Sequence, residues 1–213
     1  MSILSSKSPK TLTRILRALI IGAVMGGAGW FVGKAVADAT GGGDLNLTWS
    51  DVLAAIVALG LFVSAVAVLI TSLDPVRLSK MYGQEEASTP AEVAQARGQS
   101  LLIGFSGLLM VLPLALERLA APAAPAMAGV LVLLALHTVM NIRAYLRLDE
   151  LYRRAVQEQV MATFLLGQGL LFVWAVGERL VGLPALAAWD IYVLLMTFYL
   201  AASTVVSVRR GLA

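Results

Sequence analysis

The sequence predicts an all-α, polytopic membrane protein of six transmembrane helices with both termini in the cytoplasm. Of its 213 residues, 59% are hydrophobic and only 14% are charged, which leaves too little polar surface to cover a soluble domain. A bilayer core about 30 Å thick requires roughly 20 apolar residues per helix. Six stretches of that kind use nearly the whole chain: 15–37, 51–72, 99–119, 125–146, 158–181 and 185–208.

The basic residues predict the orientation. With these spans, all 16 Lys and Arg residues except Lys34, Arg118 and Arg179 fall on one set of loops and termini. The positive-inside rule makes that side cytoplasmic. The four tryptophans fall at or near the opposite interface, where an indole buries its ring and keeps its N–H in water: Trp30, Trp49, Trp174 and Trp189.

The first span carries a glycine pattern. Its apolar run reaches about Ala35 without a convincing cleavage site, so we expect an uncleaved helix and not a signal peptide. Two G-x-x-x-G units give a surface on which another helix can approach closely: Gly22, Gly26, Gly29 and Gly33. This surface packs either within the bundle or against another subunit.

The second span is followed by the one long connection, residues 74–98, on the cytoplasmic side. Its segment Thr89-Pro90-Ala91-Glu92 is a capping-box pattern with proline at the first helical position. The third helix therefore begins in water and runs into the membrane. We interpret residues 1–213 as a single transmembrane bundle, with 74–98 as a cytoplasmic loop and helix extension.

The third and fourth spans hold the candidate chemical groups. His137 is the single histidine of a chain without cysteine, so the sequence predicts no metal site. His137 can hydrogen-bond a neighbouring helix, act as a base, or ligate a haem or pigment. Interhelical hydrogen bonding is the commonest of these roles in membrane helices. Asn141 lies one turn further along the same face.

Two short motifs add a resemblance. Gly104-Phe105-Ser106-Gly107 resembles the Gly-x-Ser-Gly motif of rhomboid intramembrane proteases, and His137-Thr138-Val139-Met140-Asn141 resembles their His-x-x-x-Asn oxyanion motif. The resemblance implies Ser106 as nucleophile and His137 with Asn141 as the oxyanion group. In that family the His-x-x-x-Asn helix precedes the serine helix and a second histidine is the base. This chain has the opposite order and one histidine, and small residues are common at membrane helix contacts.

The fifth span begins after a charged segment and contains a polar residue among glycines. Asp149, Glu150, Arg153 and Arg154 are spaced to pair along a helix at the cytoplasmic surface, where they also form a candidate docking surface. This segment resembles small, uncharacterised bacterial multi-pass membrane proteins with an Asp-Glu-Leu-x-Arg-Arg motif. Further along, Gly167, Gln168 and Gly169 are candidate helix-packing residues, and the sixth span ends before Arg209 and Arg210.

No acidic or basic residue falls at the middle of a span, and the spans contain no complete catalytic constellation. The expected function is therefore a non-catalytic, accessory or scaffold subunit of the bacterial inner membrane. Its expected partners are the lipid bilayer, other membrane subunits or further copies, and not nucleic acid. The alternatives are a small transporter or channel, with Ser106, Thr163 and Gln168 beside His137 and Asn141 in a water-filled cavity, and thirdly an intramembrane serine hydrolase.

Overall fold

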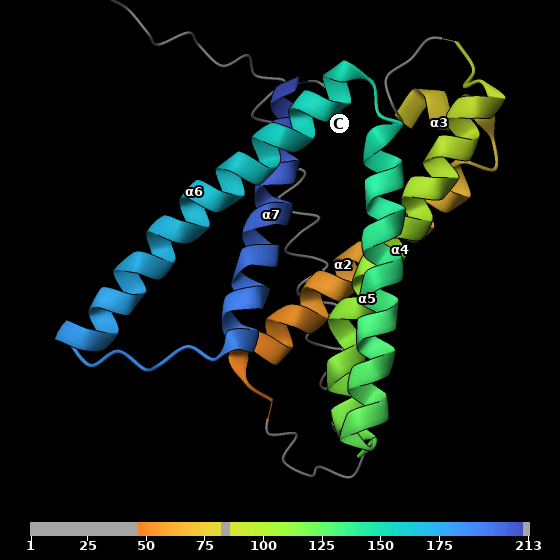
Figure 1. The fold of residues 1–213 in the computed structure, drawn as a ribbon. Coiled ribbons are helices and arrows are strands. Elements are labelled where there is room, and N and C mark those ends of the chain that lie inside the picture. The colour runs from red at the N-terminus through yellow and green to blue at the C-terminus, as the bar shows by residue number, and fades with distance from the viewer. Residues whose placement is uncertain (1–46, 82–85, 211–213) are drawn as a thin grey trace, which may run out of the picture. The chain divides into compact units, whose positions relative to one another are not determined.

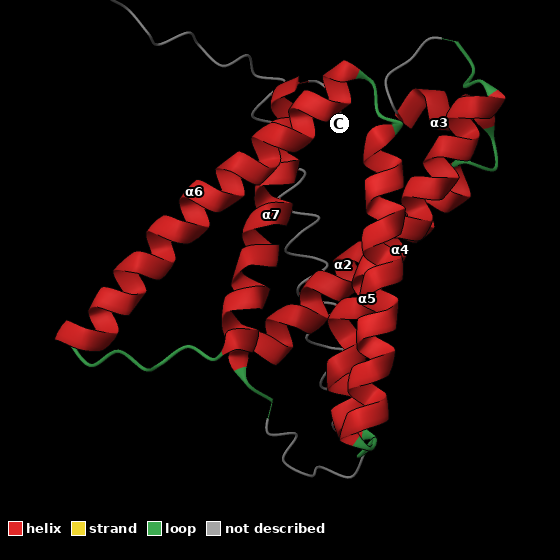
Figure 2. Ribbon diagram, viewed as in Figure 1, coloured by secondary structure: helices red, strands yellow, loops and turns green. Residues whose placement is uncertain are grey.

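The structure is a computed structural model that describes residues 47–81 and 86–210. All regular structure in this part of the chain is helical (Figure 2). The helices are α2 (Trp49–Thr71), α3 (Pro75–Met81), α4 (Pro90–Arg118), α5 (Ala123–Leu146), α6 (Glu150–Leu180) and α7 (Ala188–Arg210). Among these, five are long and apolar enough to cross a membrane, α3 being the exception. They indicate a multi-pass membrane protein.

The first predicted span lies outside the described residues. So do its glycines, Gly22, Gly26, Gly29 and Gly33. The other five predicted spans each coincide with a helix, whose ends differ by a few residues or extend beyond the apolar stretch. The short helix α3, within the connection 74–98, was not predicted because seven residues are too few for a clear apolar period.

Side-chain caps explain where the long helices begin. The Thr89 hydroxyl accepts from the Glu92 backbone N–H, and the Glu92 carboxylate accepts from the Thr89 N–H, so α4 begins at Pro90 as the capping box predicts. Thr48 and Asp51 form the same reciprocal cap on α2. Asp149 caps α6 by accepting from the Tyr152 N–H at 2.9 Å. Both α4 and α6 therefore start before their apolar spans.

The helices pack in the order α5, α4, α2, α7 and α6 (Figure 1). α2 contacts both α4 and α7, while α5 packs mainly on α4 and α6 mainly on α7. The buried core cluster accordingly gathers around α2: Ala54, Val57, Ala58 and Leu61 of α2, Met110 of α4 and Val193 of α7. The peripheral helices α5 and α6 thus connect to the central helix α2 mainly through α4 and α7.

Small residues bring α2 and α4 close together. A Cβ atom on Gly107 would lie 3.2 Å from the Ala58 carbonyl oxygen and 3.3 Å from the Leu61 Cβ. About two turns away, the buried Ser100 hydroxyl donates to the Ala65 carbonyl at 2.7 Å. Since apolar helices gain no hydrophobic driving force from leaving lipid, close packing and interhelical hydrogen bonds must hold this pair together.

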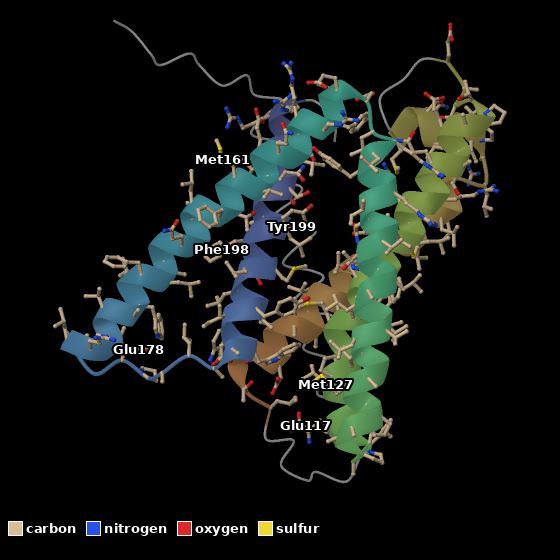
Figure 3. All side chains as sticks on the ribbon, viewed as in Figure 1. Glu117, Met127, Met161, Glu178, Phe198 and Tyr199 are labelled. Carbon is tan, nitrogen blue, oxygen red and sulfur yellow. The ribbon has the colours of Figure 1, made fainter. Side chains whose placement is uncertain are left out.

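Polar contacts join α2 to its neighbours at both ends. At one end, Arg97 of α4 donates to the Ser72 carbonyl at 3.2 Å and so satisfies a carbonyl just past the end of α2. At the other end, the Trp189 indole N–H of α7 donates to Asp51 at 2.9 Å. Glu117 and Glu178 also lie at this second end, on α4 and α6 (Figure 3). The Arg97–Ser72 and Trp189–Asp51 hydrogen bonds hold the two ends of α2 against α4 and α7.

The peripheral helices leave wide apolar faces uncovered. No residue of α5 is buried by the described part of the chain. On α6, Met161 points away from α7 (Figure 3) and its side chain is 62% exposed. In a bilayer, lipid tails or other helices cover such faces.

The close approach at Gly107 predicts a steric test. Leucine at Gly107 has to displace α4 from the α2 backbone, so we expect Gly107→Leu to lower the free energy of unfolding in mixed micelles by about 1–3 kcal/mol. Gly129→Leu is the matched control, because a Cβ atom at Gly129 meets nothing within 4 Å. Equal stability of the two variants would contradict close packing of α2 on α4.

Candidate functional site

Ser106, His137 and Asn141 meet between α4 and α5. The Ser106 Oγ lies 2.9 Å from the His137 Nε2, so the interhelical hydrogen bond expected of the histidine is present. Asn141, one helical turn after His137, places its amide nitrogen 3.2 Å from Nδ1 and 3.0 Å from the His137 carbonyl oxygen. The edge of the Phe105 ring packs against the imidazole, with the ring centroids 5.3 Å apart.

The Ser106 hydroxyl has two possible acceptors for its single proton. The Ser106 hydroxyl also lies 3.0 Å from the Leu102 carbonyl oxygen, which can only accept. The tautomer of the imidazole decides whether the hydroxyl proton goes to Leu102 or to the His137 Nε2. The Asn141 amide nitrogen lies 3.2 Å from Nδ1 and 3.1 Å from Nε2, so it does not select a tautomer. In either tautomer the Ser106–His137 contact is a hydrogen bond between α4 and α5.

The cluster also lacks an acid to orient the histidine. The only side chain within hydrogen-bond reach of Nδ1, in the described residues, is Asn141. Its amide nitrogen donates to the His137 carbonyl, so the amide oxygen is not the group that faces the ring. A Ser-His-Asn relay, in which that oxygen would accept from Nδ1, is thus not formed.

Most other hydroxyl groups in the spans donate a hydrogen bond to a carbonyl of their own helix. Within α2 and α5 to α7, each of these donates to a carbonyl four residues earlier in its own helix, at 2.8–2.9 Å: Ser64, Thr71, Thr138, Thr163, Thr197 and Thr204. A hydroxyl bonded in this way presents no free donor to a passing solute.

Gln168 is separate from the Ser106 cluster. It lies on α6, which packs on α7, whereas Ser106 and His137 belong to the α4–α5 pair. Gln168 lines an open groove that contains neither Ser106 nor His137. Gln168 and Ser106 thus lie on different helix pairs, and the transporter alternative stays a prediction.

The two glycines beside Gln168 have different surroundings. A Cβ atom on Gly167 would come within 2.6 Å of Leu195, so Gly167 lies in the contact between α6 and α7. Gly169 meets nothing within 4 Å and lines the open groove with Gln168. The amide of Gln168 makes no hydrogen bond to any residue that the structure describes.

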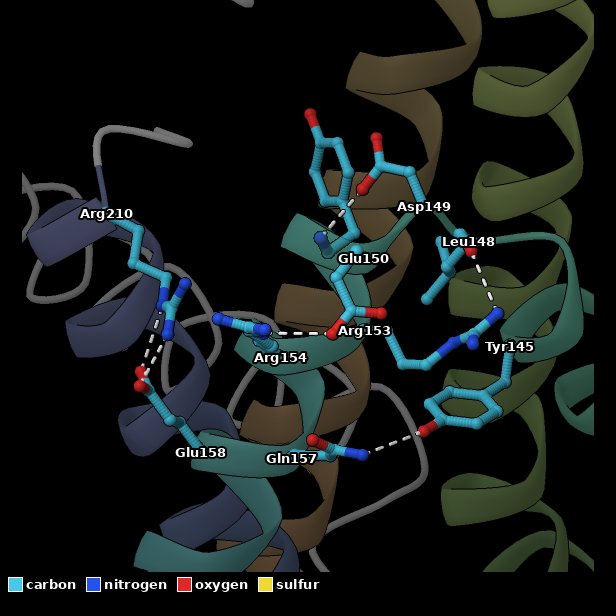
Figure 4. Close-up of polar contacts among 10 residues, drawn as sticks. Tyr145, Leu148, Asp149, Glu150, Arg153, Arg154, Gln157, Glu158 and Arg210 are labelled. Carbon is cyan, nitrogen blue, oxygen red and sulfur yellow. Dashed lines mark hydrogen bonds and ion pairs between the residues drawn. The ribbon is translucent and has the colours of Figure 1, made fainter.

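The charged segment at the start of α6 forms contacts within the chain (Figure 4). Glu150 pairs with Arg154 at 2.9 Å, one of the pairs that the sequence spacing predicts. The Arg153 guanidinium lies over the Tyr145 ring, 5.6 Å from its centroid, and donates to the Leu148 carbonyl at 3.2 Å. Asp149 caps the helix. These residues stabilise the α5–α6 turn, and docking through their exposed charges stays a prediction.

The ion pair between Arg210 and Glu158 was not predicted from the sequence. Arg210 at the end of α7 donates from its Nε to Glu158 of α6 at 2.9 Å, and a second bond joins the same groups (Figure 4). Opposite charges at facing ends of consecutive antiparallel spans are the signal that could have found it.

Comparison of the chain with models of protein families, with curated proteins and with solved structures finds no match.

The Ser106–His137 bond predicts an energetic coupling without reactivity. Ser106→Ala and His137→Ala should each lower the stability in micelles, and the double variant should show a coupling of about 0.6 kcal/mol, the average for such bonds in a membrane protein. The measurement is a double-mutant cycle of unfolding. Additive effects would show that the two side chains do not interact.

The Ser106→Ala variant also distinguishes a packing role of the cluster from a hydrolytic one. A fluorophosphonate probe, which reacts with activated serines, should label neither the unmodified chain nor Ser106→Ala. Labelling that disappears in Ser106→Ala would identify a nucleophile and overturn the structural role of the cluster.

Proposed function

We propose that the chain is a non-catalytic accessory or scaffold subunit of the bacterial inner membrane, which binds another membrane protein through the exposed face of α6. One observation carries the proposal: Gln168 presents an amide without a hydrogen-bond partner in the described chain, in an apolar groove at mid-helix. The groove has a volume of about 820 Å³ and also includes Phe164, Gly169 and Phe172.

The position of the amide makes a partner energetically favourable. At 1.5 Å per residue, Gln168 lies about 15 Å along α6 from Glu158 and about 18 Å from Leu180, so water at either interface is out of its reach. An amide that is not hydrogen-bonded in hydrocarbon costs several kcal/mol. A polar side chain on a neighbouring helix removes that cost.

The shape of the groove fits a helix. Gly169 provides a place where a second backbone can approach, because nothing lies within 4 Å of its missing side chain. The aromatic rings of Phe164 and Phe172, 62% and 69% exposed, stand two turns apart on the same helix and supply apolar contact area on either side of Gln168. Small residues with a central amide form the usual contact between membrane helices.

Native mass spectrometry of the protein, extracted gently from its own membrane, tests the accessory role. We expect a stoichiometric second polypeptide that Gly169→Leu releases, because leucine fills the groove. Gly129→Leu, an equally open glycine on α5, should leave the complex intact. A bare monomer or a homo-oligomer carrying only lipid would contradict the role, as would equal release by both variants.

The same proposal includes a topology. Residues 15–37 form a sixth span, and both termini lie in the cytoplasm with the connection 74–98, as the positive-inside rule indicates. Arg77 and Lys80 in α3, and Arg209 and Arg210 at the end of α7, belong to this basic side.

The absence of cysteine makes the topology directly measurable. In intact cells, an impermeant maleimide should label Leu119→Cys, whose parent side chain is 78% exposed between α4 and α5, but not Val76→Cys on α3. Ser5→Cys should behave like Val76→Cys. Labelling of Ser5→Cys from outside would leave an odd number of spans and end the six-span topology.

A further inference from the structure

The first half of α4 and the last half of α5 enclose an apolar hollow with a basic rim. Its volume is about 600 Å³. Ala91, Ala94 and Gly98 of α4 form a smooth wall, and Leu102 and Met140 lie furthest toward the middle of the helices. A wall of small side chains beside larger apolar ones leaves a slot for an acyl chain, which dispersion contacts can fill.

Two arginines at the rim of this hollow have no counter-ion among the residues that the structure describes. Arg143 and Arg147 lie one turn apart on α5 and both line it. Neither makes an ion pair or a hydrogen bond within residues 47–81 and 86–210, whereas Arg77, Arg154 and Arg210 are all paired. Like charges at this spacing repel. A phosphate between them would relieve the repulsion and accept charge-assisted hydrogen bonds.

A second, polar hollow shares a border with the first. It has a volume of about 340 Å³ and shares Gln95, Gln99 and Arg147 with the apolar one. Its remaining lining includes the carboxylates of Glu92 and Asp149. The polar hollow therefore places negative charge next to the positive rim.

Unsatisfied polar groups line this second hollow. Ser88 is only 6% exposed, and its hydroxyl oxygen has no hydrogen-bond partner in the described chain. The amides of Gln95 and Gln99 make no hydrogen bond either. Burial and the nearby carboxylates of Asp149 and Glu92 raise the pKa of the Tyr152 phenol, which lines the same hollow outside the apolar spans. The hollow thus has acceptors and negative potential suited to an ammonium group.

The depth of these groups matches the polar region of a bilayer. α4 begins at its water-exposed cap, Thr89, and the predicted apolar span starts near Gln99. On α5, Arg143 lies in the last turn, and the helix ends at Leu146. Basic side chains at the end of a span meet lipid phosphates there.

We infer that this site holds a phospholipid with a primary ammonium headgroup, of the phosphatidylethanolamine class. Its phosphate lies between Arg143 and Arg147, its ammonium enters the polar hollow beside Asp149 and Glu92, and one acyl chain occupies the slot along α4. The match of adjacent positive and negative protein charges with a zwitterionic headgroup distinguishes this lipid from phosphatidylglycerol, which carries no cation. The inference is independent of the groove at Gln168.

Lipid titration of the delipidated full-length protein, followed by native mass spectrometry, tests the site. The probes are phosphatidylethanolamine, phosphatidylglycerol and phosphatidylcholine with identical acyl chains. We expect phosphatidylethanolamine to bind most tightly, because a quaternary ammonium cannot donate hydrogen bonds to carboxylates. Arg143→Gln and Arg147→Gln should each weaken this binding about fivefold. Arg77→Gln, which removes an arginine already paired with Asp74, is the control.

A second pair of variants tests the headgroup without disturbing the helices. Asp149→Asn and Glu92→Gln keep groups that cap α6 and α4 but remove the negative charge. They should abolish the preference for phosphatidylethanolamine over phosphatidylcholine and leave the binding of phosphatidylglycerol undiminished. Tighter binding of phosphatidylglycerol to the unmodified protein would overturn the inference. So would equal lipid binding by Arg147→Gln and Arg77→Gln.

Discussion

The close contact between α2 and α4 is the constraint on which the rest of the described fold depends. Gly107 faces the α2 backbone near Ala58, and Ser100 bonds to a carbonyl about two turns further along the same pair. Because lipid surrounds apolar helices as readily as protein does, only this close packing gives α2 and α4 a fixed distance and register. α5 and α7 then pack on that pair, and α6 follows on α7.

The polar side chains of the spans divide into those that the fold satisfies and those that it leaves facing outward. Ser106 and His137 bond to each other across α4 and α5, and most span hydroxyls bond to their own helix. Gln168, Arg143 and Arg147 have no such partner in the described chain. Since uncompensated polar groups are costly near hydrocarbon, the outward-facing ones are where binding to other molecules is favourable. The proposed partner helix and the proposed lipid both follow from this division.

Much of the local structure could be predicted because its causes are local. The Thr89–Glu92 cap lies within one helical turn, so the start of α4 followed from four consecutive residues. The pairing of Glu150 with Arg154 is likewise an (i, i+4) contact. The Arg210–Glu158 pair and the contact of Arg97 with Ser72 join different helices. Their distances depend on how helices pack, which no local pattern specifies.

The sequence by itself determined that the chain is helical and bilayer-spanning, since span length and apolar composition follow directly from the thickness of hydrocarbon. It also identified Ser106, His137 and Asn141 as candidate site residues. Only the tertiary structure decided that Ser106 and His137 are hydrogen-bonded, because their distance of 2.9 Å depends on how α4 packs on α5. Motif spacing specifies which residues a helix carries, whereas a bond between two helices requires that their packing bring donor and acceptor within about 3 Å.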